Sequence, residues 1–178
     1  MFGAQALVAA WPFEDAPVRG GWSVDALAAH SANPLMAALA RAARARRQPG
    51  ALPPGFVRVF LSDRDGDGRA FGGASRYVLH FSRTALPPAA THWTVAALAD
   101  DGTSPDDGRS ALAGNAPDIR RNGDGSLDIV VQASPPDDPV ANWLASPGGR
   151  FRLILHVYAP LPDDGWRPPP IVRRESAA

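Results

Sequence analysis

The stretch Asn122–Gln132 constrains the fold most, because a tight turn leads directly into an alternating segment. The turn is Asn-Gly-Asp-Gly, and its glycines suit the positive φ angles of a hairpin. After it, apolar residues alternate with polar ones: Leu127, Ile129 and Val131 against Ser126, Asp128 and Gln132. A period of two is the pattern of a β-strand with one buried face. The stretch therefore predicts a β-protein.

Other segments repeat this strand pattern. Apolar and β-branched residues gather in five short runs: 56–61, 75–81, 91–99, 126–133 and 150–158. The 17 glycines and 19 prolines of the chain supply many turns between such runs. Short strands separated by turn residues predict a β-sandwich or barrel.

Composition narrows the functional classes. The 178-residue chain is 45% hydrophobic, which fits one domain with a real core. It has no cysteine, so disulfides, thiolate metal sites and cysteine nucleophiles are excluded. Eighteen basic residues balance eighteen acidic ones, and nothing indicates nucleic-acid binding. No apolar run reaches the length of about 18 residues that a membrane span needs.

The first 54 residues differ in character from the rest. Residues 1–10 are apolar but lack the basic start of a signal peptide, so we expect a cytoplasmic protein, or a periplasmic one if the chain is a truncated or processed form. Trp11, Phe13 and Trp22 predict an aromatic arm laid over the core. Short helices are predicted from Val24 and over 34–48, with Asn33-Pro34 as the cap of the second. We place a domain boundary between residues 54 and 55.

The predicted helix over 34–48 ends in four arginines, Arg41, Arg44, Arg46 and Arg47. Cations near a helix C-terminus favour the helix dipole, so a solvated face explains them. The alternative is assembly, in which this face docks on an acidic partner.

Two segments of the chain contain Asp-Gly pairs, and the first has part of the spacing of a calcium-binding loop. Asp63, Asp65, Asp67 and Gly68 stand at positions 1, 3, 5 and 6 of a calcium loop, but position 12 is Ala74 where an acid is required. Strands rather than helices flank the segment. We therefore interpret it, and Asn122–Gly125 likewise, as a turn between strands.

Three histidines fall on predicted strands and form the only candidate metal site. His80, His92 and His156 each sit on the face opposite the apolar residues of their strand. If these faces lined one cavity, three imidazoles with an open position could hold zinc or iron for hydrolytic or oxygenase chemistry. None of the spacings is a ligand motif, so surface or core roles remain the alternative.

Two longer connections follow. Residues 100–118 are acidic and have little that could pack, which predicts a mobile loop. In the second, Asp138-Pro139 can cap one helical turn that presents Asn142, Trp143 and Leu144. A tryptophan there either binds a ligand or closes the end of a sandwich. No nucleophile elbow, phosphate loop or dinucleotide fingerprint occurs.

Several segments in sequence order resemble the family called domain of unknown function 1214. The matching segments include Ser75–Phe81, Leu86–Pro88, Trp93-Thr94, Asn122–Ile129, Asn142–Leu144, Phe151–Pro160 and Trp166–Pro169. The resemblance implies a jelly-roll-like β-sandwich over residues 55–178, often paired in bacteria with the domain of unknown function 1254. It implies no activity. Relatives usually carry arginine where this chain has His156, so any anion bound there would need a protonated imidazole.

We expect a mainly β, jelly-roll-like sandwich that acts as a binding or interaction module for a small molecule, a glycan or a protein domain. We do not expect an enzyme. The alternative hypothesis is a metal-assisted hydrolase or cupin-like enzyme that uses the three histidines. A homo-oligomer is possible. The expected ligand-binding residues are Asn142, Trp143, Trp166, His156 and Tyr158. No cofactor is expected unless the histidines bind metal.

Overall fold

The computed structural model describes residues 16–17, 20–24, 57–89, 92–105, 109–161 and 165–174. The predicted helix over 34–48, most of the aromatic arm, the arginine cluster at 41–47 and the domain boundary at 54/55 lie outside these residues. The start of the other predicted helix is wrong, because Val24 ends a strand. Of the arm, the structure describes two short strands, β1 (Ala16–Pro17) and β2 (Trp22–Val24).

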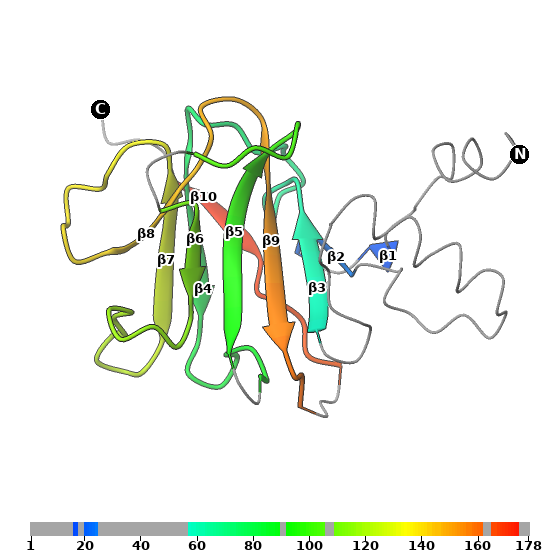
Figure 1. Cartoon of the computed structure of the whole chain (residues 1–178), viewed down its shortest axis with the longest axis vertical. Coiled ribbons are helices and arrows are strands. Elements are labelled where there is room, and N and C mark those ends of the chain that lie inside the picture. The colour runs from blue at the N-terminus through cyan, green and yellow to red at the C-terminus, as the bar shows by residue number, and fades with distance from the viewer. Residues whose placement is uncertain are drawn as a thin grey trace, which may run out of the picture.

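Within the described residues, ten strands form two sheets (Figure 1), in agreement with the predicted mainly β fold. The six-stranded sheet has the order β1-β2-β3-β9-β5-β6, with β3 (Val57–Ser62), β9 (Phe151–Tyr158), β5 (Trp93–Ala99) and β6 (Ala111–Ala113). The four-stranded sheet has the order β10-β4-β7-β8, with β10 (Ile171–Arg174), β4 (Arg76–Phe81), β7 (Leu127–Gln132) and β8 (Asn142–Ala145). Every pair is antiparallel except β7 with β8.

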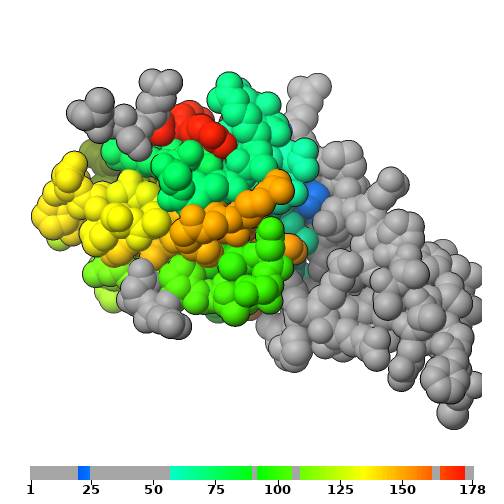
Figure 2. Space-filling model, turned by 90° about the horizontal axis from the view of Figure 1, so that it is seen from above, coloured from blue at the N-terminus to red at the C-terminus, as the bar shows by residue number. Residues whose placement is uncertain are grey.

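Alternation along the strands places one core between the sheets. Tyr77, Leu79 and Phe81 of β4 and Leu127, Ile129 and Val131 of β7 are fully buried, and they pack against Val95, Leu153, Leu155 and Val157 of the other sheet. In Figure 2, seen from above, β10 in red and the green residues around β5 lie on opposite sides of the body. The molecule is a β-sandwich, as predicted.

A second, smaller apolar cluster lies on the outer face of the six-stranded sheet. Val57, Val59 and Ile154 are buried there, and Leu61, Leu98 and Tyr158 pack against them. Strand β3 therefore has apolar residues on both faces, as its sequence predicts.

The five strands expected from the sequence are confirmed to within two residues at either end. Two predictions on the connections are wrong. Ala111–Ala113, expected in a mobile loop, pair with Thr94–Ala96 as the edge strand β6. Asn142–Leu144, expected on a helical turn, belong to strand β8, because hydrogen bonding to β7 prevails over the local signal of Asp138-Pro139. Asp138 does cap a turn, since its carboxylate accepts the N–H of Val140 at 3.0 Å.

Both Asp-Gly segments are turns, as predicted. Gly68 and Gly125 have φ angles of +83°. The N–H of Gly68 donates to the carbonyl of Asp65, and that of Gly125 donates to the carbonyl of Asn122. Positive φ at these two positions explains the choice of glycine.

Candidate functional site

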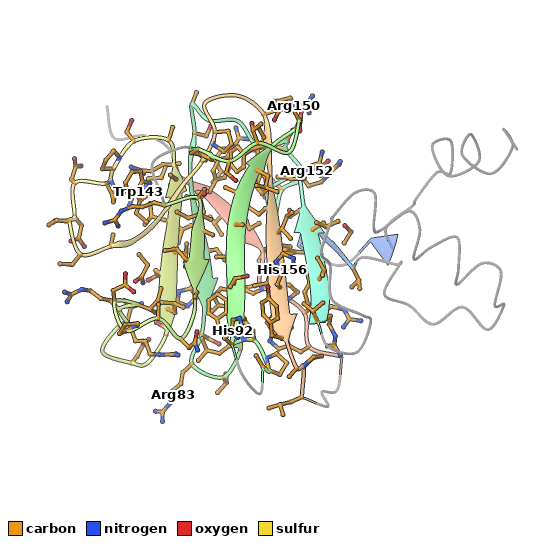
Figure 3. The ribbon with its side chains drawn as sticks, viewed as in Figure 1. Arg83, His92, Trp143, Arg150, Arg152 and His156 are labelled. Atoms are coloured by element: carbon orange, nitrogen blue, oxygen red, sulfur yellow. The ribbon has the colours of Figure 1, made fainter. Side chains whose placement is uncertain are left out.

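The five residues expected to bind a ligand lie in three separate places. Asn142 and Trp143 begin the edge strand β8, His156 and Tyr158 lie on the outer face of β9, and Trp166 precedes β10. In Figure 3 the labelled Trp143 lies well away from His92 and His156. The structure therefore does not assemble these residues into one pocket.

The side-chain amide of Asn142 holds a loop against the sheet. Its Oδ1 accepts the backbone N–H of Arg120 at 2.8 Å, and its Nδ2 donates to the carbonyls of Arg120 and Asp128, both at 2.8 Å. Both donors of the amide and one acceptor site are thereby used. Asn142 thus fixes the position of Arg120 relative to β7.

Both tryptophans donate their indole N–H within the protein. Nε1 of Trp166 reaches the carbonyl of Ala85 at 3.2 Å, and its ring packs edge-on against Phe60 with centroids 5.5 Å apart. Nε1 of Trp143 donates to the carbonyl of Gln132 at 2.9 Å. The guanidinium carbon of Arg109 lies 5.7 Å from the Trp143 ring centre, within cation–π range. Trp143 can therefore offer a ligand its ring but not its N–H.

His80 and His156 lie on strands of different sheets, and His92, which was expected on a strand, directly precedes β5. His92 stacks on Tyr158 with centroids 4.2 Å apart, and the ring of His156 lies 5.9 Å from that of Tyr158 (Figure 3). His80 lies on the outer face of β4, where its Nδ1 contacts Oδ1 of Asp128 at 2.7 Å. The three-histidine site is thus not assembled, because the faces that carry these residues point away from each other. Among the described residues, no group of three or more histidines and acids is placed to hold a metal ion.

A hollow of about 650 Å³ lies on the outer face of the four-stranded sheet. Val78 of β4 and Val130 of β7 are cross-strand partners that form its base. The loops around Arg121 and Asp137 form its sides. We call this hollow the arginine groove, because four arginines line it: Arg76, Arg120, Arg121 and Arg174.

Within the described ranges, the arginines of the groove form no ion pair. Arg174 of β10 lies directly opposite Arg76 of β4 in the strand register, on the outer face of the sheet. Like charges in directly opposite positions are destabilising. Across the described residues, none of the four guanidinium groups forms an ion pair or a hydrogen bond. Four exposed positive groups therefore surround one hollow.

The groove also has three carboxylates, but two of them are already engaged. Asp138 caps the turn at Val140, and Asp128 accepts hydrogen bonds from Asn122 at 2.7 Å and from His80. Partial burial raises the pKa of Asp128, but the hydrogen bonds from Asn122 and His80 outweigh it and hold the pKa below its usual value. Asp128 is consequently ionised at neutral pH and directed toward His80 and Asn122.

A second hollow of about 440 Å³ lies beside the groove at the edge of β8. We call it the tryptophan hollow. Its walls mix apolar groups, among them Leu112, Ile119 and the ring of Trp143, with the charged side chains of Arg109 and Asp118. Four residues line both hollows: Arg120, Val140, Ala141 and Asn142.

Comparison with known families decides what kind of domain this is. The family described as "Protein of unknown function (DUF1214)" matches residues 57–162, which is more than half of the chain. The chain belongs to the DUF1214 family. The resemblance found in the sequence is thereby confirmed, and the pairing with a domain 1254 stays a prediction.

A solved structure shares the fold of this DUF1214 chain, and a second one shows a weaker similarity. The VPA0106 protein from Vibrio parahaemolyticus is similar with a TM-score of 0.61 and 22% identity, over 77% of this chain and 35% of that one. An uncharacterized protein from Burkholderia cenocepacia is similar with a TM-score of 0.49 and 19% identity, over 70% of this chain and 30% of that one. This chain thus spans about a third of the length of these proteins. No curated protein matches it.

One further observation concerns membranes. No helix in the described ranges has the length and hydropathy that crossing a bilayer demands.

The arginines of the groove are the candidate residues that the sequence analysis missed. The alternation of Arg76, Val78 and His80 with buried residues does place Arg76 on the outer face of its strand. Its partner Arg174 is nearly a hundred positions away in the sequence, and only the register of β10 on β4 brings the two together. The DUF1214 sequence therefore contained a signal for the outward position of Arg76 but none for the cluster.

Proposed function

We propose that this DUF1214 chain is a ligand-binding module that holds a multivalent anion, a phosphate or a carboxylate, in the arginine groove. One observation supports the proposal most, namely that Arg76 and Arg174 face each other on adjacent strands with no ion-pair partner among the residues that the structure describes. An anion bound between them would convert a repulsive pair into two charge-assisted interactions.

The surroundings support the same ligand class. Arg120 and Arg121 bring two more guanidinium groups to the groove, and the planar fork of a guanidinium matches the oxygens of carboxylates and phosphates. A volume of about 650 Å³ lies within the range of small-molecule sites. The base of Val78 and Val130 gives the groove an apolar floor beneath its charged rim.

Titration calorimetry at low ionic strength tests the proposal, with inorganic phosphate and citrate as probes. We expect Arg76→Gln or Arg174→Gln to weaken binding by about 10- to 100-fold, because a hydrogen bond to a charged group contributes about 1.5–3 kcal/mol. Salt should weaken binding of both probes through screening.

The matched control is Arg150→Gln, which removes the same charge from an exposed position that does not line the groove. It should leave both affinities unchanged. If neither probe binds, or if the three variants lose affinity equally, the arginine groove is not an anion site.

A further inference from the structure

The tryptophan hollow shares its lining with the arginine groove at a single bridge. The bridge consists of Arg120 and the segment Val140–Asn142, joined by two hydrogen bonds between the Asn142 amide and the backbone of Arg120. Because those bonds fix the backbone of Arg120, its exposed side chain stands where both hollows meet. A ligand held by Arg120 in the groove is therefore next to the tryptophan hollow.

The tryptophan hollow is built from fixed parts. The indole of Trp143 is oriented by its hydrogen bond to the Gln132 carbonyl. Ala145, which lies in β8 with Trp143, donates its N–H to the carbonyl of Arg109 at 2.8 Å and so holds Arg109 beside this strand. Leu112 and Ile119 pack against the core of the sandwich. A preformed hollow of this kind binds at a lower ordering cost than a loop that must rearrange.

The chemistry of this hollow differs from that of the groove. Its walls combine a tryptophan ring, aliphatic side chains and two prolines with the polar groups of Asp118 and Asn142, and the guanidinium of Arg109 lies over the ring. Flat apolar groups stack favourably on such rings, and guanidinium planes stack on them as well. The indole N–H of Trp143 is already used, so this side chain offers a ligand ring contact rather than a hydrogen bond.

From this juxtaposition we infer that the ligand is bipartite, an organic anion whose phosphate or carboxylate lies in the arginine groove while a flat apolar group attached to it occupies the tryptophan hollow. The inference rests on the proposed function and adds the class of molecule. Arg120 is the residue that contacts both parts, and Trp143 selects the flat group.

The experiment compares three probes by titration calorimetry on the whole chain: inorganic phosphate, 1-naphthyl phosphate and 1-naphthol. We expect 1-naphthyl phosphate to bind at least about tenfold more tightly than phosphate, since an aromatic contact is worth about 0.5–1.5 kcal/mol beyond the area that it buries. Trp143→Ala should remove that advantage and leave the affinity for phosphate unchanged. Arg76→Gln should weaken both anions.

A second measurement keeps the test valid if Trp143→Ala fails to fold. The indole N–H resonance of Trp143 is identified in a proton–nitrogen NMR spectrum by its loss in Trp143→Phe. It should shift on titration with 1-naphthyl phosphate and stay in place with phosphate.

The outcomes separate the two proposals. Equal affinities of phosphate and 1-naphthyl phosphate, or an advantage that survives Trp143→Ala, would overturn the bipartite ligand and leave the anion site standing. Binding of 1-naphthol as tight as that of 1-naphthyl phosphate would also overturn it, because the anion would then contribute nothing. Failure of phosphate to bind at all would overturn the arginine groove itself.

Discussion

Asp65 has the sequence position of a calcium ligand, but its side chain has a structural role. Its place in Asp63–Gly68 imitates a calcium ligand, yet its side chain is turned inward and is 1% exposed. Oδ1 accepts the N–H groups of Asp67 at 3.1 Å and Arg69 at 2.9 Å, and Oδ2 accepts Nε of Arg173 at 3.1 Å. The carboxylate therefore joins its own turn to the C-terminal strand. The sequence indicated the turn, but the pairing with a residue more than a hundred positions away could not be predicted from it.

Replacing Asp65 should consequently destabilise the domain. We expect Asp65→Ala to lower the free energy of unfolding by about 3 kcal/mol, the lower end of the range for breaking a buried ion pair, because Arg173 keeps some contact with water. Urea denaturation measures the change. The control is Asp63→Ala, whose exposed pair with Arg64 should be worth about 0–1 kcal/mol. Equal losses in the two variants would contradict a structural role for Asp65.

At the scale of the strands, alternation predicted the centre of each sheet but not its edges. Strands β3, β4, β5, β7 and β9 have six to eight residues, enough for the period of two to be visible. Strand β6 has three residues, and β8 and β10 have four each. Such short runs are defined by the neighbour to which they bond, and for β10 that neighbour, β4, is distant in sequence. Because β10 carries Arg174, the pair that it forms with Arg76 escaped prediction together with this edge, whereas Trp143 of β8 was expected as a ligand-binding residue.

The joint between β5 and β6 depends on a close approach that only glycine permits. A Cβ atom at Gly114 would lie 1.8 Å from the ring of Trp93, which is buried in the core. We expect Gly114→Ala to cost at least about 1–3 kcal/mol, because the ring must move out of its packed position. Thermal and urea unfolding measure the loss.

The matched control for Gly114 is Gly123→Ala, where no atom lies within 4 Å of the added methyl group. That substitution should change the stability by less than about 0.5 kcal/mol. A Gly114→Ala variant as stable as Gly123→Ala would show that the Trp93 ring is not held as described.

For the whole molecule, the sandwich and its family could be predicted from the sequence, whereas the arginine groove could not. The site is formed by the outer face of the four-stranded sheet, where β10 adds Arg174 beside Arg76 and the loop held by Asn142 adds Arg120. These parts come from separate regions of the chain and meet only in the folded sheet. Our sequence prediction emphasised aromatic and histidine side chains, most of which the structure places in packing or stacking roles.

The central claim is that the two opposed arginines are kept for an anion at the expense of stability. The most direct measurement is urea unfolding of the unmodified chain and of Arg76→Gln, at low ionic strength, with and without phosphate. Without phosphate we expect the variant to be more stable by about 0.2–1 kcal/mol, because it lacks the repulsion of a like-charged pair. Phosphate at about 100 times its dissociation constant should add about 2.7 kcal/mol to the unmodified chain and reverse the order. If Arg76→Gln is the less stable protein without phosphate, or gains as much from phosphate as the unmodified chain, the account of the arginine groove is contradicted.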